Sequence, residues 1–226
     1  MPNLETLRWG IEPKSTHLFE AAFANADVTL PTVKHIVPAA YSEWLVRRCP
    51  NLQSLRAGCF FDHASWNSYD AKLKKEYDPM AALINATKGL PIEKLHLRSK
   101  WPSDWMDMLS AILDATPNIT NLEMDGEIGS RWSGDSRPLD RHLKFLTKFP
   151  NLTSLALPSA GHLGLSFDGG PGCGNVYFGR GGRAYGRQVT EERAKTVEEA
   201  ANMAMEALPH LKHLSVGGFV REHHVE

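Results

Sequence analysis

A short motif, a proline followed by apolar residues in the pattern Leu-x-x-Leu-x-Leu, recurs along this 226-residue chain and constrains its fold more than any other feature. The clearest copy spans 149–157, Phe-Pro-Asn-Leu-Thr-Ser-Leu-Ala-Leu. Other clear copies begin at Pro2, Pro50, Pro91, Pro117 and Pro209, and a looser copy begins at Pro31. Self-similarity of this kind arises when one structural unit is stacked on itself, so the chain is predicted to have a repeat architecture.

The spacing and patterning of the motif predict the kind of repeat. Successive motif prolines are 19 to 59 residues apart, and leucine-rich repeats are roughly 20–29 residues long. Apolar and other residues alternate within each motif, as in a strand with one buried face. Each proline also stops a preceding helix, because it cannot continue the hydrogen-bond ladder. We therefore predict an α/β leucine-rich-repeat solenoid, a single domain over 1–226 with short parallel strands on its concave face and helices on its convex face.

The segments between motifs have the periodicity and capping residues of helices. The predicted helices are 15–24 (capped by Ser15, with Leu18, Ala22 and Phe23 on its buried face), a short one after Ser42, 79–88, one beginning at Ser103, 138–148, and 190–208 capped by Thr190. The predicted strands include 93–98, 120–125 and 212–217, and we expect the tail from Arg221 onwards to be frayed.

A glycine-rich insertion at about 159–187 interrupts the repeats. Ten of the 18 glycines fall between 161 and 186, so a long loop is predicted, since ordering so much glycine costs backbone entropy. We expect a flap over the small residues Ser154 and Ala156, with Phe167 and Tyr177 buried. The alternative is an enzyme or a nucleotide or RNA binder that uses the loop around Cys173, with His162 as the base. The loop lacks both G-x-G-x-x-G and a G-K-[ST] ending.

Composition limits the classes of partner and compartment. The net charge of −1 gives no general electrostatic reason to bind nucleic acid or an anionic membrane. No signal peptide and no apolar run of membrane-spanning length is present in the sequence. Cys49, Cys59 and Cys173 are few, odd in number and widely spaced, which favours reduced thiols in a cytoplasmic or nuclear protein.

The residues between the motif leucines should point away from the core and line a continuous surface. We predict that a protein partner binds this concave face. The predicted contact residues are Arg8, His35, Arg56, Lys94, His96, Arg98, Asn121, Glu123, Asp125, Ser154 and His213. The first of these are basic, and an acidic pair follows. We find no nucleophile motif and no metal-ligand set, so we predict no catalytic residue, cofactor or metal.

Three stretches carry a more specific resemblance. The run 163–177, Leu-Gly-Leu-Ser-Phe-Asp-Gly-Gly-Pro-Gly-Cys-Gly-Asn-Val-Tyr, together with 208–214 and 30–37, resembles a group of fungal leucine-rich-repeat proteins, many of which carry an F-box. The resemblance implies a role in choosing substrates for a cullin-based ubiquitin ligase, with an adaptor bound through the F-box. No F-box motif occurs in this sequence, and Met1 opens inside a repeat. We therefore expect a fragment of a longer chain that retains the recognition surface.

Overall fold

The computed structural model describes residues 3–57, 79–98, 106–125, 138–165 and 181–222. The chain divides into two compact units. The first comprises Met1–Lys100, Asp107–Glu123 and Phe149–Leu152, and the second comprises Trp101–Met106, Met124–Lys148 and Thr153–Glu226. One boundary between the units falls within strand β5 (Asn121–Asp125). The single domain over 1–226 stays a prediction.

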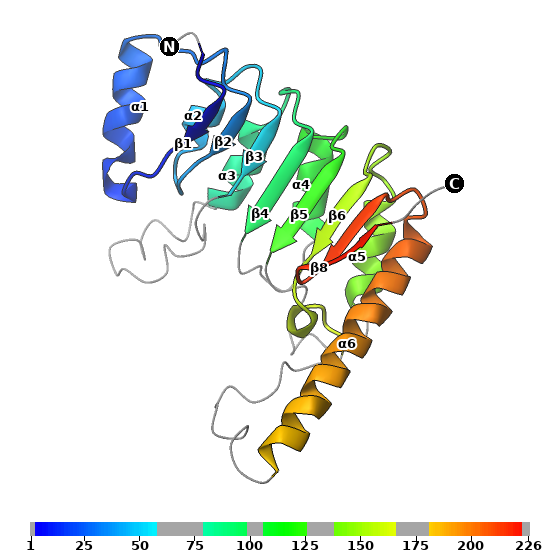
Figure 1. Ribbon diagram of the computed structural model, residues 1–226. Coiled ribbons are helices and arrows are strands. Elements are labelled where there is room, and N and C mark those ends of the chain that lie inside the picture. The colour runs from blue at the N-terminus through cyan, green and yellow to red at the C-terminus, as the bar shows by residue number, and fades with distance from the viewer. Residues whose placement is uncertain (1–2, 58–78, 99–105, 126–137, 166–180, 223–226) are drawn as a thin grey trace. The chain divides into compact units, whose positions relative to one another are not determined.

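The first unit is built on short parallel strands that follow chain order (Figure 1). They are β1 (Thr6–Arg8), β2 (His35–Val37), β3 (Ser54–Arg56) and β4 (Lys94–Arg98). Each pairs with the next in parallel, and the register places the central apolar residues Leu7, Ile36, Leu55 and Leu95 in one row. The predicted α/β class with parallel strands is therefore confirmed for this unit.

Successive repeats are joined by one recurring set of backbone hydrogen bonds. The Glu5 carbonyl accepts from the amides of Lys34 and His35, at 2.8 and 3.0 Å. The carbonyls of Lys34, Gln53, Glu93 and, in the second unit, Thr153 accept in the same way from two consecutive amides of the next motif. Since the motif occupies equivalent positions each time, the repeat in the sequence corresponds to a repeat in the backbone.

The polar residue after the motif proline also links neighbouring repeats. Asn51 donates its side-chain amide to the Pro31 carbonyl at 2.8 Å, and the Asn151 amide contacts the Asn118 side-chain oxygen at 3.4 Å. Thr32 takes this place in the looser copy and donates to the Leu4 carbonyl at 2.9 Å. The polar residue of the motif is thus explained by hydrogen bonds between repeats.

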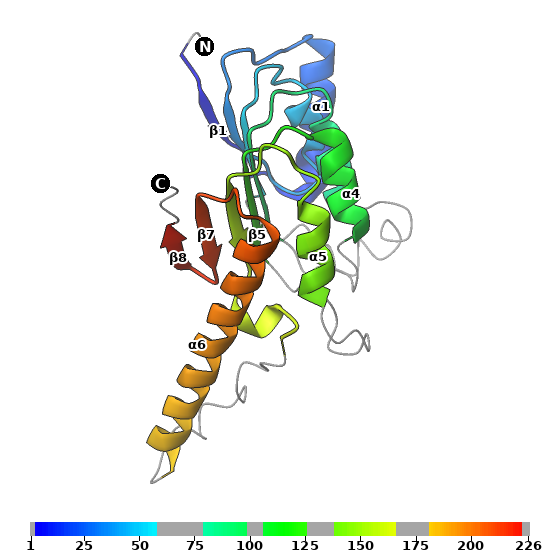
Figure 2. The ribbon, with the colours of Figure 1, turned by 90° about the vertical axis from the view of Figure 1, so that its right-hand side faces the viewer.

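Helices cover one face of the strands in the first unit (Figure 2). They are the 3-10 turn η1 (Pro13–Ser15), α1 (Thr16–Asn25), α2 (Glu43–Val46), α3 (Pro79–Ala86) and α4 (Met106–Ala115). Helices α3 and α4 each bury an apolar face, at Met80, Leu83, Ile84, Leu109 and Ile112. Gly89 follows α3 with a φ of +81°, the left-handed conformation that glycine commonly supplies at the end of a helix. The residues 58–78 and Ser103 lie outside the described residues.

The prediction for the buried face of α1 is wrong at Leu18 and Ala22 and right at Phe23. Leu18 is 62% exposed and Ala22 is exposed, and the helix packs through Phe19 and Phe23, which meet the Trp9 ring edge to face at centroid distances of 5.5 and 6.0 Å. Phe23 also contacts Trp44 at 5.3 Å. Aromatic rings contribute more contact area than leucine or alanine, so they determine which side of the helix faces the strands. Ser15 precedes α1 without making the predicted side-chain capping hydrogen bond.

The second unit contains α5 (Pro138–Leu146), β6 (Ser154–Leu157), η4 (Ala160–His162), α6 (Gly182–Ala207), β7 (His213–Val216) and β8 (Phe219–Glu222). Strands β6 and β7 are parallel, and β7 and β8 are antiparallel. Helix α5 lies within the predicted range 138–148 and buries Leu139, Leu143 and Leu146. Helices α5 and α6 pack together within this unit.

Two predictions for the second unit are wrong. Helix α6 begins at Gly182, so residues 182–187 are not loop, and Thr190 donates to the Gly186 carbonyl at 2.8 Å from within the helix. Adding a turn to an existing helix is far easier than nucleating one, which offsets the cost of Gly182 and Gly186. Arg221 and Glu222 belong to β8 rather than to a frayed tail.

Candidate functional site

The outward face, meaning the strand side chains that point away from the buried motif residues, carries the predicted contact residues. In β4, Leu95 and Leu97 are buried, whereas Lys94 and Arg98 are exposed and His96 is half-buried. Strands β2, β3, β5, β6 and β7 also bury their motif residues, and Leu7 of β1 is half-buried. Exposed are Arg8, His35, Arg56, Lys94, Arg98 and His213, and half-buried are His96, Asn121, Glu123, Asp125 and Ser154. The predicted orientation is therefore correct, and partner binding at these residues stays a prediction.

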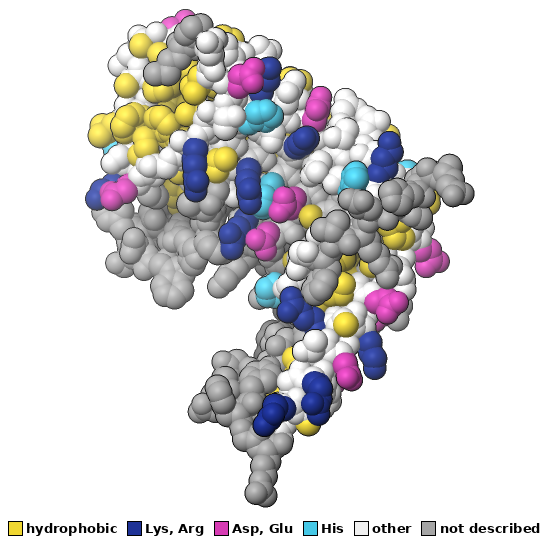
Figure 3. Space-filling model, viewed as in Figure 1, with side chains coloured by type: hydrophobic (Ala, Val, Ile, Leu, Met, Phe, Trp, Pro, Cys, Tyr) yellow, Lys and Arg dark blue, Asp and Glu magenta, His cyan; other side chains and the backbone are white. Residues whose placement is uncertain are grey.

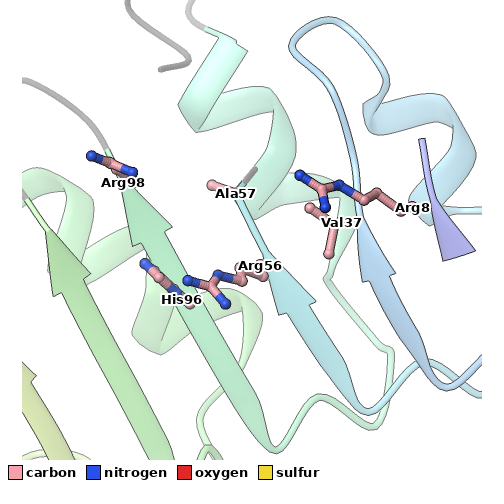
Figure 4. Close-up of a pocket in the computed structure, with 6 residues that line it drawn as sticks. All are labelled: Arg8, Val37, Arg56, Ala57, His96 and Arg98. Atoms are coloured by element: carbon pink, nitrogen blue, oxygen red, sulfur yellow. The ribbon is translucent and has the colours of Figure 1, made fainter. Parts of the chain in front are cut away.

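Four of the predicted residues meet at one pocket in the first unit. The pocket has a volume of about 310 Å³ and is lined by Arg8, Val37, Arg56, Ala57, His96 and Arg98 (Figure 4). The lining residues come from β1 to β4 or directly follow β3. His35, Lys94, Asn121 and Glu123 lie on the same unit outside this lining. Asp125, Ser154 and His213 belong to the second unit.

Strand register determines how the pocket is arranged. Arg8 pairs with Val37 on β2, and Arg56 pairs with His96 on β4. Figure 4 shows the Arg8 side chain extending toward Val37, the Arg56 guanidinium lying beside His96, and Arg98 at the end of β4. Neighbouring strands are about 4.8 Å apart, so the strands that carry Arg8 and Arg56 are separated by roughly 10 Å across β2. Because Val37 is short and apolar, the space between the two arginines is open.

His96 links the pocket to the next strand. Its Nδ1 lies 3.1 Å from a carboxylate oxygen of Glu123, and the His96 side chain is only 11% exposed. This contact fixes the imidazole orientation, and it places the carboxylate of Glu123 against the histidine. The histidine thus offers the pocket a positioned ring that is positively charged when protonated.

Charge is unevenly balanced on the outward face of the first unit. Away from the outward face of this unit, Lys34 pairs with Glu5 at 2.9 Å and Arg48 with Asp27 at 3.6 Å. Within the described part of the chain, Arg8 and Arg56 have neither an ion-pair nor a hydrogen-bond partner. Figure 3 shows several dark-blue basic side chains over the strands of this unit, with fewer acidic ones among them. The face therefore holds guanidinium groups with free donors.

Sequence reasoning missed the apolar part of the pocket. Val37 was not among the predicted contact residues, and Ala57 was assigned to the core, where it is indeed 2% exposed. The signal was present in the motif alignment, because Val37 takes the place that arginine takes in the copies on both sides. Val37 therefore adds an apolar wall to a pocket that is otherwise lined mainly by basic side chains.

Cys173, Phe167 and Tyr177 lie outside the described residues, so the predicted flap and the alternative site around Cys173 stay predictions. His162 is described, exposed, and 3.3 Å from the Ser159 hydroxyl through Nδ1. Cys49 is buried and its thiol lies 3.4 Å from the Leu45 carbonyl oxygen. Burial raises the pKa of Cys49 to about 11, so this thiol is a small core residue and a poor nucleophile near neutral pH.

The described residues also lack two other kinds of feature. They contain no group of three or more histidine, cysteine, aspartate or glutamate side chains placed to hold a metal ion. None of their helices has the length and apolar character needed to cross a membrane. Comparison with family models, curated proteins and solved structures finds no match.

Proposed function

We propose that this chain is a non-enzymatic protein-interaction module of the leucine-rich-repeat type and that it binds its partner on the outward face of the strands. One observation carries the proposal. Aligned strands place Arg8 and Arg56 on an open face, around a pocket, with no described partner for either guanidinium. Exposed polar residues positioned by a rigid scaffold more often serve binding than folding.

The repeat interpretation is supported by the hydrogen bonds that recur between successive motifs, including the side-chain contacts of Asn51 and Asn151. Stacked repeats generate extended binding surfaces, because every strand adds outward side chains to the same face. The resemblance to fungal F-box proteins adds a more specific form of the proposal. In that form the partner is a substrate delivered to a ubiquitin ligase, and a separate F-box supplies the adaptor contact.

The test is a comparison of captured partners. The wild-type chain and the variant R56Q/R98Q/E123Q are used as baits in a fungal lysate, and the bound proteins are quantified by mass spectrometry. We expect the variant to lose the partners that the wild type enriches, by about 10-fold or more, since charged contacts at an interface are each worth a factor of this order.

A second variant controls for the change in net charge. R47Q/K88Q/D107N removes two positive charges and one negative charge from exposed positions at or near the helices of the same unit. It should retain the wild-type partners. If the strand-face variant retained them as well, the outward face would not be the binding surface.

A further inference from the structure

Strand β1 has hydrogen-bonding groups on one side that no described strand takes up. Among the described strands it pairs with β2 alone. The Trp9 amide donates to the Val37 carbonyl at 2.9 Å, and the Glu5 carbonyl accepts from the next motif. The groups of successive residues point alternately to the two edges of a strand. The amides and carbonyls of Thr6 and Arg8 therefore point to the edge of β1 that faces away from β2.

Apolar side chains gather beside this edge. Leu18 and Phe19 of α1, at 62% and 41%, are the large hydrophobic residues that stay exposed in the described part of the chain. Figure 1 shows α1 beyond β1 in the direction in which the strands follow one another, and Figure 3 shows hydrophobic side chains over this end of the first unit. Leu7 of β1 is half-buried, whereas its register partner Ile36 is 1% exposed. An added strand beside β1 would cover Leu7, and exposed apolar patches of this kind mark interaction sites.

The charges around this edge suit a second copy of the same surface. Glu5 pairs with Lys34 at 2.9 Å, and Glu12 pairs with Lys14 at 2.8 Å. These carboxylates and ammonium groups neutralise one another within one chain, so they present no field of one sign to attract a strongly charged partner. Two copies of a surface whose charges are already paired can meet without net repulsion, as an interface between identical patches requires.

An antiparallel pair of β1 strands also satisfies the backbone groups at the edge. With a two-fold axis at Leu7, Thr6 of one copy lies opposite Arg8 of the other, and such a pair exchanges both of its hydrogen bonds. Leu7 then faces Leu7 of the second copy, with the two Cα atoms about 4.5 Å apart. Because threonine lies opposite arginine, no like charges stand directly across the pair. The sequence of β1 is thus complementary to itself.

We infer that this chain forms a homodimer in which β1 pairs antiparallel with β1 of a second copy, and that Leu18 and Phe19 extend the interface onto the helix layer. The inference goes beyond the proposed function and does not depend on it. Pairing at a strand edge leaves each side chain on its own face of the joined sheet. The outward faces of both copies therefore lie on the same side and stay uncovered.

Sedimentation equilibrium over the micromolar range measures the dissociation constant of the dimer. Thr6→Pro removes one interface amide from each copy, and it spares the bonds between β1 and β2 because the Thr6 amide points to the other edge. Thr6→Val keeps the amide and is the matched control. We expect the wild type and Thr6→Val to dimerise equally well, and Thr6→Pro to weaken the dimer by about 10-fold or more, since each copy loses a backbone hydrogen bond.

Leu18→Glu tests the apolar part of the interface at a position whose exposure makes unfolding no concern. It should also weaken the dimer by about 10-fold, because it places a charge in an apolar contact. Asn85→Glu is the control, since it adds the same charge at an exposed position of α3. It should leave the dissociation constant unchanged. Circular dichroism of each variant checks that the chain still folds.

Disulfide trapping reads the register of the pair. In a Cys59→Ser/Cys173→Ser background, Leu7→Cys should cross-link two copies in oxidised glutathione, because a Cα separation of about 4.5 Å lies within disulfide range. Glu5→Cys should not, since the two copies of this residue lie on opposite sides of the axis.

A wild-type chain that stays monomeric over the micromolar range would overturn the inference and assign the edge to another partner. A dimer that survives both Thr6→Pro and Leu18→Glu, or that cross-links through Glu5→Cys, would overturn the assignment to β1.

Discussion

The strands of the two units share one motif but carry different outward faces. In the first unit, β1 to β4 present Arg8, Arg56, Lys94 and Arg98. In the second unit, β6 and β7 present Ser154, Ala156, His213 and Ser215. Both sets alternate with buried leucines, so the backbone forms equally well with small neutral residues at these positions. The arginines are therefore not required by the strands, which leaves their side chains available for binding.

The units differ also in how well the first and last motif strands are covered. Leu4 and Leu7 of the first motif copy are half-buried, whereas the equivalent Leu211 and Leu214 are 0% and 2% exposed. Strand β7 lies between β6 and β8, while β1 pairs with β2 alone among the described strands. One motif residue can thus contribute very different amounts to stability, depending on its neighbours.

The largest predicted effect tests this difference directly. Leu214→Ala should lower the free energy of unfolding by about 2–5 kcal/mol, the range for a fully buried leucine. Leu7→Ala, at the same motif position, should cost less than about 1.5 kcal/mol, because its side chain is already partly hydrated and a smaller area is lost. Urea unfolding followed by circular dichroism measures both variants.

Leu95→Ala supplies the internal control, because Leu95 is 1% exposed in the first unit. It should behave like Leu214→Ala. If Leu7→Ala destabilised the chain as much as Leu95→Ala does, then β1 would be covered by more than the described contacts provide.

A second prediction concerns the turn that brings β8 onto β7. Gly217 and Gly218 have φ values of +57° and +87°, the conformation that a two-residue hairpin turn requires. A Cβ on Gly217 would lie 2.8 Å from the Ser159 backbone, whereas a Cβ on Gly218 meets nothing within 4 Å. Gly217→Ala should therefore cost about 2–3 kcal/mol, the left-handed backbone cost plus the clash, and Gly218→Ala only about 1 kcal/mol.

Thermal unfolding of both variants checks this prediction, and each serves as the control for the other. Equal destabilisation would mean that Ser159 moves away without cost. In that case the backbone conformation alone, and not the close approach between the turn and Ser159, would set the requirement for glycine at position 217.

Much of the fold follows from the sequence, because the motif repeats a local pattern. The alternation around Leu95 predicts which side chains of β4 are buried, and the spacing of Leu139, Leu143 and Leu146 predicts the buried face of α5. These features depend on the period of a strand or a helix, which single-sequence patterns contain. For the same reason, the outward orientation of Arg8, Arg56 and His96 was predictable.

The predictions from sequence were wrong or incomplete where residues distant in the sequence determine the local structure. The buried face of α1 is set by Trp9 and Trp44, which a pattern within 16–25 cannot reveal. Gly182 and Gly186 join α6 although glycine disfavours helix locally. The pocket itself depends on strand register, since only the pairing of Arg8 with Val37 shows that the space between Arg8 and Arg56 is open. Local patterns thus predict which strand residues point outward, and strand register determines which of these residues line the same pocket.

The smallest predicted effect tests whether like charges on the outward face of the first unit lower the free energy of unfolding. The outward face of the second unit, which carries fewer charges, serves as the comparison. Arg8, Arg56 and Arg98 line one pocket, so like charges repel across it. Arg56→Gln should therefore raise the free energy of unfolding by a few tenths of a kcal/mol at low ionic strength, the order measured for exposed charge pairs. The gain should vanish at about 1 M salt, where the Debye length falls to about 3 Å.

Ser215→Gln is the matched change on the second unit, because Ser215 is an outward residue of β7. Its effect should not depend on salt, since it alters no charge. Urea unfolding at about 0.01 M and about 1 M sodium chloride, in buffer without phosphate, compares the two variants. A salt-independent loss of stability in Arg56→Gln would mean that the Arg56 stem stabilises the strands by packing. The arginine would then be explained by folding, and the contrast between the two faces would no longer argue for binding.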